Sequence, residues 1–127
     1  MNQVEEGYSD KSEKEFEQIY QRKMSDLEEK RDAILEEAGK IAADEEIIWD
    51  IDREMRQIYK EMAEHCDEEK FLLDLENSED EFYDCQRKIE NELEDKKEML
   101  EKQKKDTYDE EDELRLEIRK QRDKIEE

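Results

Sequence analysis

The sequence predicts an all-α protein, a long antiparallel helical hairpin of the coiled-coil kind that assembles with partner helices. Three observations support this: apolar residues at seven-residue spacing, a break in that spacing near the middle, and a chain with two glycines and no proline. A strict seven-residue step stays on nearly one face of an α-helix, drifting by about 20° per heptad, and favours packing against another helix. The residues of this stripe are Tyr20, Leu27, Ile34, Ile41, Ile48, Met55 and Met62.

The positions that accompany the stripe are poor in apolar side chains. Three residues after each stripe position, only Ile51 and Ile58 are aliphatic, and most of the others are charged. A strong two-stranded coiled coil needs apolar residues at both seam positions. We therefore expect the first half of this seam to be too thin for a strong dimeric zipper. Four residues after the stripe, the sequence adds Met24, Ala38, Tyr59 and Cys66.

We expect residues 1–11 to form a flexible tail and residues 12–127 a single helical-hairpin domain, with arms of about 12–66 and 68–126. Ser12 and Glu15 have the spacing of a capping box, in which each side chain bonds a free backbone amide at a helix start. Gly39 lies inside the first arm, where glycine costs up to about 1 kcal/mol relative to alanine. It is either tolerated or marks the close approach of a partner helix.

The apolar stripe ends after Met62, because the next position in step is Glu69. Asp67 can cap a new helix, and the acidic residues after it suit the first turn. These features predict a turn at 66–69. A second capping box gives an alternative turn at 76–78. We prefer the first, since it keeps the apolar residues of the second arm on one helical face.

The second arm carries its own apolar stripe, which weakens after Leu100, where Thr107 takes the core position. Five consecutive acidic residues follow at 109–113. We interpret them as a solvated face, with a docking patch for a basic partner as the alternative. The residues of the second stripe are Leu72, Leu75, Phe82, Ile89, Leu93, Leu100, Leu114, Ile118 and Ile125.

The charge of the chain disfavours several classes of ligand. Its net charge is −22, so we expect neither nucleic acid nor an anionic membrane as a partner. Residues 1–10 do not resemble a signal peptide, and no apolar run approaches the ~20 residues that span a bilayer. We therefore expect a cytoplasmic protein. Disorder is the alternative for a chain with 54% charged residues, but the stripe argues against it.

We expect no enzymatic activity, no cofactor and no metal. His65, Cys66 and Cys85 supply at most three soft ligands, whereas structural zinc sites need four. Nucleotide-binding loops need glycines that this sequence lacks. A two-helix chain also has little interior in which to perturb the pKa of a catalytic group. We expect the two cysteines to be small buried residues, and a bridge across the hairpin is the alternative.

Two antiparallel helices cover only one side of each other, so we expect other side chains to bind a third or fourth helix. Trp49 follows Ile48 at the side of the stripe, and tryptophan is enriched in interface hot spots. Packing in the core is the alternative for Trp49. The candidate partner-binding residues are Trp49, Tyr59, Phe71, Tyr83 and Met99.

The second arm holds a set of short motifs in a fixed order: Leu75-Glu76, Phe82, Gln86-Arg87, Leu93-Glu94 and Glu111-Asp112-Glu113-Leu114. With these motifs, its size and its acidic helical hairpin, the chain from about Ser12 onward resembles a group of small α-helical accessory proteins. They are encoded beside LXG toxins of type VII secretion systems in Gram-positive bacteria.

The resemblance implies a helical adaptor, or targeting chaperone. Such proteins bind the N-terminal helical domain of the toxin, together with a second small helical protein of the WXG type, and direct the toxin to export. Co-export with the partner is then an option. Trp49 is followed by Asp50 and Ile51, so the chain lacks the Trp-x-Gly turn and does not look like the WXG-type member. The alternatives are a homo-oligomeric coiled-coil structural protein and an acidic nucleic-acid mimic.

Overall fold

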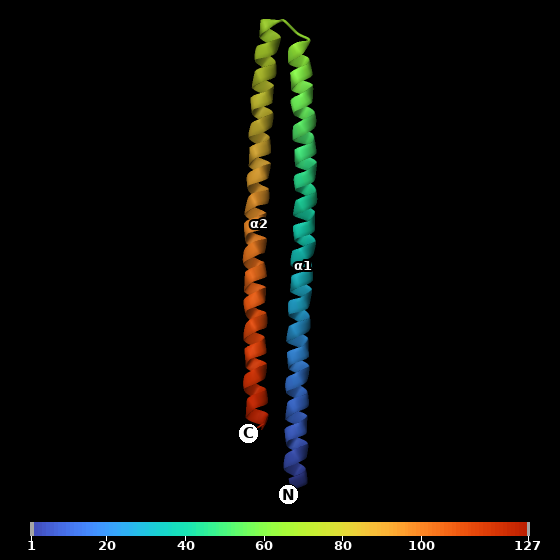
Figure 1. Ribbon diagram of the computed structural model, residues 1–127, viewed down its shortest axis with the longest axis vertical. Helices are drawn as coiled ribbons and strands as arrows, with labels where there is room; N and C mark the ends of the chain where they lie inside the picture. Colours follow the sequence, from blue (N-terminus) through green and yellow to red (C-terminus); the bar gives the residue numbers. More distant parts are fainter. Residues whose placement is uncertain (1, 127) are drawn as a thin grey trace. The chain divides into compact units, whose positions relative to one another are not determined.

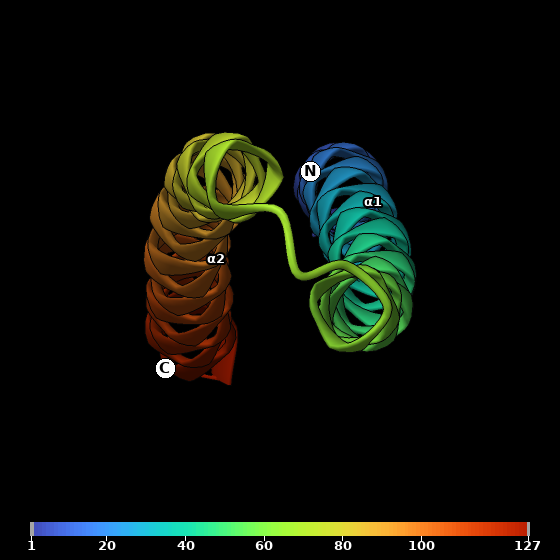
Figure 2. The ribbon, with the colours of Figure 1, turned by 90° about the horizontal axis from the view of Figure 1, so that it is seen from above.

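The protein is an all-α helical hairpin, as predicted, with two long helices packed against each other (Figures 1 and 2). This computed structural model describes the backbone of residues 2–126 and the side chains of residues 12–124. Helix α1 spans Asn2–Glu64 and helix α2 spans Glu69–Glu126.

Residues 65–68 connect the two helices (Figure 1), which confirms the turn predicted at 66–69 and excludes the alternative at 76–78. The backbone amide of Leu72 donates to the carbonyl of Glu68 at 3.0 Å. The carbonyl of a cap residue accepts the first helical hydrogen bond. The cap of α2 is therefore Glu68, one residue after the predicted Asp67.

Helix α1 begins at Asn2, so the start that we predicted at Ser12 is wrong. The capping-box spacing of Ser12 and Glu15 lies inside the helix. Such a signal marks the start of a helix only where the residues before it resist helix formation, and residues 2–11 contain no proline to do so. The expected flexibility of residues 1–11 is not tested by the structure, in which the side chains of these residues are not described, and it stays a prediction.

Two compact units make up the hairpin, and each contains a segment of both helices. Unit 1 combines Met1–Leu35 with Glu101–Glu127, and unit 2 is Glu36–Leu100, including the connection. Within each unit the two helical segments lie side by side and run in opposite directions (Figures 1 and 2). The single domain expected over residues 12–127 stays a prediction.

The seam of unit 1 contains few apolar side chains. Leu27 and Leu114 are buried, and Tyr20 and Ile34 are half-buried. Thr107 is buried, as predicted, and its hydroxyl donates to a backbone carbonyl one turn earlier at 2.8 Å. Ile118 is half-buried, and Ile125 lies outside the described side chains.

The seam of unit 2 is thicker. Two predicted seam residues are nevertheless exposed: Met62, at the last turn of α1, and Ile89, three residues after the buried Gln86 that takes the seam position. Sequence reasoning did not predict that Gln86 is a seam residue. The buried residues of this seam are Ile41, Tyr59, Leu75, Gln86 and Leu93. The half-buried apolar residues are Ile48, Met55, Phe71, Leu72, Phe82 and Leu100.

The second row of the α1 seam lies four residues after the stripe, not three. Tyr59 is buried in this row, and Glu45 and Asp52 are half-buried. Steps of four and three residues then alternate, which is the repeat of a coiled coil. Ile51 and Ile58, three residues after the stripe, are exposed.

Gly39 is not required by any close approach inside the hairpin. A Cβ atom added at this position would meet nothing within 4 Å. This favours a tolerated glycine over a close contact with α2. Close approach of a different partner at residues 38–42 stays a prediction.

Candidate protein-interaction surface

Tyr59 belongs to the core of unit 2. Its ring centroid lies 6.2 Å from that of Phe82, and its hydroxyl forms a 3.2 Å hydrogen bond with the hydroxyl of Ser78. Only 8% of the residue is exposed. The prediction that Tyr59 stays free for a partner helix is therefore wrong, because its row of α1 faces α2.

Tyr83 and Phe71 are half-buried, so they offer only part of their rings to a partner. Arg56 lies over the ring of Tyr83, 5.4 Å from its centroid, and Phe82 packs against the same ring with centroids 5.6 Å apart. Burial raises the pKa of Tyr83, while the positive charge of Arg56 acts in the opposite direction. A role for these two residues in binding stays a prediction.

Trp49 and Met99 are exposed, at 58% and 63%. Ile48 faces the seam, and successive residues of an α-helix project about 100° apart. Ile47 and Trp49 therefore project on opposite sides of the seam. The structure thus places Trp49 on the opposite side of the seam from Ile47 and Ile51.

A row of exposed apolar side chains follows the Ile47 side of α1 in unit 2. Ile47, Ile51, Ile58 and Met62 are 56%, 42%, 45% and 41% exposed. Their steps of four, seven and four residues keep them on one side of the helix. Sequence reasoning missed this row, because it assigned Ile51 and Ile58 to the seam as the two aliphatic residues of its second row. Their spacing from Ile47 was the signal that could have found the exposed row.

Helix α2 extends the row on the same side of unit 2. The exposed Ile89 and the buried Leu93 line a groove of about 250 Å³ together with Ile47 and Ile48 of α1. The side chains that complete the lining are Asp44, Glu92 and Lys96. We call the residues Ile47, Ile51, Ile58, Met62 and Ile89 the apolar face.

Acidic side chains border the apolar face. Glu54 and Glu61 each follow an isoleucine of the row by three residues, which places them at its edge. Asp44 and Glu92 line the groove. Among residues 12–124, no ion pair involves any of these four carboxylates.

The seam-facing acids on the Trp49 side of unit 2 are paired within the chain. Asp52 accepts a 2.9 Å hydrogen bond from Arg56, and Glu45 accepts one from Lys97 of α2. The hydrogen bond with Glu45 raises the pKa of Lys97. The two sides of unit 2 therefore differ: one presents acids without an ion-pair partner among residues 12–124 around apolar residues, although Glu61 accepts a 3.0 Å hydrogen bond from Gln57, and the other presents ion-paired acids beside Trp49.

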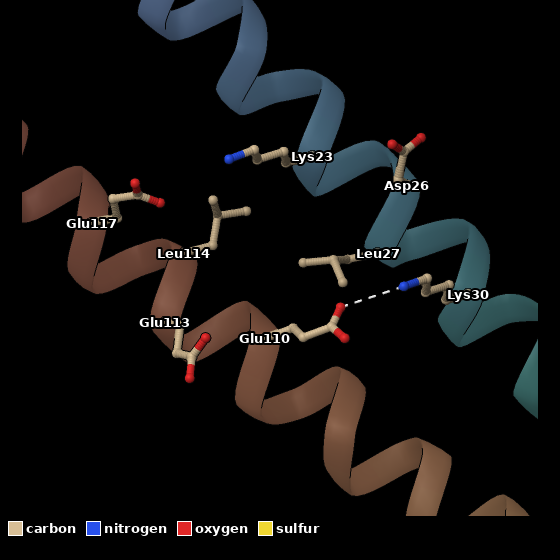
Figure 3. A pocket seen from close by; sticks show the side chains of 8 residues that line it. All are labelled: Lys23, Asp26, Leu27, Lys30, Glu110, Glu113, Leu114 and Glu117. Carbon is tan, nitrogen blue, oxygen red and sulfur yellow. Dashed lines mark hydrogen bonds and ion pairs between the residues drawn. The ribbon is translucent and has the colours of Figure 1, made fainter.

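Unit 1 places ion pairs across its seam. Figure 3 shows Leu27 and Leu114 pointing toward each other, with Lys30 and Glu110 paired beside them at 3.4 Å. Arg31 pairs with Glu111, which is only 2% exposed. We interpreted residues 109–113 as a solvated face; Glu111 departs from this because it faces α1. The sequence signal was its step of four residues from Thr107.

Tyr20 adds a polar contact to the seam of unit 1. Its hydroxyl donates to the backbone carbonyl of Leu114 at 2.7 Å. Burial raises the pKa of Tyr20. Phe16 packs near the same ring, with centroids 5.8 Å apart. This unit therefore stabilises its helix pair largely through directional polar contacts.

Cys66 and Cys85 are free thiols, one half-buried near the connection and one exposed on α2. Neither the alternative of a bridge between them nor the expected burial of both is observed, because Cys85 is exposed. Within the described residues, no cluster of three or more histidine, cysteine, aspartate or glutamate side chains could hold a metal ion. Neither helix contains, over its described residues, a stretch long and apolar enough to cross a membrane.

The exposed apolar side chains of so small a hairpin indicate one or more protein partners. Comparison of the chain with protein-family models, with curated proteins and with solved structures finds no match.

Proposed function

We propose that the protein is a non-enzymatic helical adaptor that binds another helical protein. The observation that supports this is the apolar face of unit 2, where four aliphatic side chains of α1 remain more than 40% exposed beside a formed seam. Fully burying one such side chain contributes roughly 1.5–3 kcal/mol, so covering this row would give a substantial gain. Protein surfaces with contiguous apolar patches are typical of binding sites.

In its more specific form, the proposal is a targeting chaperone for a secreted toxin. The partner is then the N-terminal helical domain of an LXG toxin, joined by a small WXG-type protein, and the complex is directed to type VII export. The identity of the partner rests on the resemblance of the second-arm motifs. The binding role rests on the exposed apolar residues and stands without it.

The test is co-expression with small helical proteins and toxin domains encoded by the adjacent genes. We expect one complex of fixed stoichiometry in size-exclusion chromatography. We also expect a higher melting temperature than for the protein alone, because a partner that binds only the folded state stabilises it. A discrete homo-oligomer that ignores every neighbour-encoded protein would instead favour a structural coiled coil. Binding to a DNA-binding protein, competed by DNA, would favour a nucleic-acid mimic.

A further inference from the structure

We infer that the apolar face is the docking site for a basic amphipathic helix, whose apolar stripe is bordered by lysine and arginine. This inference rests on the proposed adaptor function and adds the surface and the chemistry of the partner. It differs from the sequence-based assignment, which placed Trp49 at the centre of binding.

The geometry of the face suits a helix. Ile47 and Met62 are separated by about 22 Å at 1.5 Å per residue, which matches roughly four turns of a partner helix. The row lies at one side of the α1–α2 seam, and Ile89 of α2 forms the other wall of the groove beside Ile47. A helix laid along this groove can therefore contact both helices of unit 2, with its own apolar residues at steps of three and four.

The charges distinguish a basic partner from a second copy of this chain. Unit 2 contains 24 acidic and 9 basic residues, a net charge of −15. The carboxylates at the edge of the apolar face, Glu54 and Glu61, have no ion-pair partner among residues 12–124. A second copy would bring the same acids against them, and like charges across an interface disfavour association. Lysine and arginine at the edges of a partner helix would complement them.

The same comparison argues against the Trp49 side. There Asp52 and Glu45 already have cationic partners, Arg56 and Lys97. A basic helix docking at Trp49 would have to displace these contacts. The unpaired acids and the exposed aliphatic row coincide only on the Ile47 side of unit 2.

The experiment uses the full chain and two synthetic helical peptides with identical leucine stripes. One peptide has lysine at the flanking positions and the other has glutamate. We expect the lysine peptide to bind, with an affinity that falls as salt is added, because salt screens the charges at the edge of the face. The glutamate peptide should bind at least about tenfold more weakly.

Three variants locate the site. The double variant Ile51→Ser with Ile58→Ser should reduce the affinity for the lysine peptide about tenfold or more. Leu73→Ser is the matched control: Leu73 is 58% exposed and lies two residues from the buried Leu75, about 200° around α2. We expect less than about a twofold change for this control and for Trp49→Ala. Circular dichroism checks that each variant keeps its helix content.

A fourth variant keeps the test valid if the serine double variant loses helix content. Glu54→Lys with Glu61→Lys changes only exposed positions, and it should reverse the preference between the two peptides. Equal binding of both peptides, an unchanged preference in this variant, or no peptide binding at all would overturn the inference. A loss of peptide affinity confined to Trp49→Ala would also overturn the inference. A dimer of the chain that the serine double variant disrupts would overturn it as well, because the occupant of the apolar face would then be a second copy.

The outcomes separate this inference from the proposed function. If a co-expressed partner forms a stable complex that survives Ile51→Ser with Ile58→Ser, the adaptor role stands and the apolar face is not its site. If the lysine peptide binds as described while no neighbour-encoded protein forms a complex, the face is a helix-binding site and the adaptor role with those proteins is wrong.

Discussion

Unit 1 and unit 2 contain segments of the same two helices but hold them together by different means. Unit 1 buries an ion-paired glutamate and a threonine as well as two leucines. Unit 2 buries aliphatic side chains, the aromatic Tyr59 and one polar residue, Gln86. Of the exposed large apolar residues within 12–124, four belong to unit 1 and eight to unit 2. The unit with the richer core thus also carries more apolar surface than its own seam covers.

The net charges make this difference more pronounced. Unit 1 has 21 acidic and 14 basic residues, a net charge of −7, against −15 for unit 2. Among the described residues, unit 1 has two ion pairs across its seam and unit 2 has one. The acids that border the apolar face of unit 2 have no ion-pair partner within residues 12–124. An apolar surplus together with unpaired charge is costly in an isolated hairpin and is relieved by a partner of opposite charge. Both units pair α1 with α2, and the difference between them supports the proposal that unit 2 carries the partner-binding surface.

The largest expected effect comes from placing a charge in each core. Ile41→Asp in unit 2 should lower the free energy of unfolding by roughly 3 kcal/mol or more, because Ile41 is 5% exposed in an apolar seam. Leu27→Asp in unit 1 should cost less, since Lys30 and Arg31 lie close enough in sequence to interact with the new carboxylate. Urea unfolding followed by circular dichroism measures both, with the exposed Leu35→Asp as control. Equal costs at the two sites would show that the cores do not differ as described.

The next prediction concerns the buried carboxylate of unit 1. Arg31→Ala leaves Glu111 buried without its partner, and we expect a loss of about 1–3 kcal/mol in the free energy of unfolding. Glu111→Leu should cost less or even stabilise, because the side chain of Arg31 is 50% exposed and can be solvated. Thermal unfolding of the two variants gives the ranking. The reverse ranking would mean that Glu111 supports the seam through contacts other than this pair.

The seven-residue period was enough to predict the hairpin, its turn and the burial of Leu27 and Ile41, because period and seam break are properties of one helix at a time. The second row of the seam was not predicted, because charged residues occupy much of it and charged side chains are normally expected to face solvent. Glu111 is buried and pairs with Arg31 of the other helix. Such a pair depends on the register between helices, which a single-helix pattern does not contain.

The candidate site shows the same limit. The exposure of Trp49 is consistent with its expected place beside the seam, whereas Tyr59 faces α2 because the seam uses steps of four residues after the stripe. Ile51 and Ile58 were expected in the seam, and the structure exposes them on the Ile47 side of α1 instead. Which side of a helix is left uncovered follows from where the second helix packs, and that information is absent from the first helix alone.

A smaller effect is expected from the hydrogen bond between Tyr59 and Ser78 in unit 2. Tyr59→Phe keeps the ring against Phe82 and removes only the hydrogen bond to Ser78, so we expect a loss of about 1 kcal/mol in the free energy of unfolding. The paired variant Ser78→Ala should cost a similar amount, and the double variant little more than either one. Additive costs in this cycle, measured by urea unfolding, would show that the two hydroxyls do not act through each other.

Gly39→Ala is expected to raise the free energy of unfolding by about 0.5–1 kcal/mol, because alanine is the better helix former and the added Cβ meets open space. The melting temperature of the isolated chain measures this. A lower melting temperature would mean that the helix at Gly39 is packed more closely than described. If the variant is more stable but fails to bind a co-expressed partner, the glycine marks the approach of that partner.

The smallest effect appears at alkaline pH and again distinguishes the units. The hydrogen bond to Glu45 raises the pKa of Lys97 above its ordinary 10.5, so the folded state holds this proton more tightly than the unfolded state. The contribution is therefore fully present below pH 10.5 and is lost as pH rises through the higher folded-state value. Burial also raises the pKa values of Tyr20 and Tyr83, so the free energy of unfolding of the hairpin should fall above about pH 10.

Glu45→Gln should remove only the contribution of Lys97, in unit 2, to this loss of stability at alkaline pH. Asp50→Asn is the control, because Asp50 pairs with Arg53, whose guanidinium stays charged over this range. Tyr20→Phe removes the contribution of unit 1 together with its hydrogen bond to Leu114. Thermal unfolding from pH 8 to 11.5 compares the three variants with the parent chain. If Glu45→Gln leaves the alkaline slope unchanged, Lys97 is not held by Glu45 in solution, and the acids on the Trp49 side would then be as free to attract a basic partner as those at the apolar face.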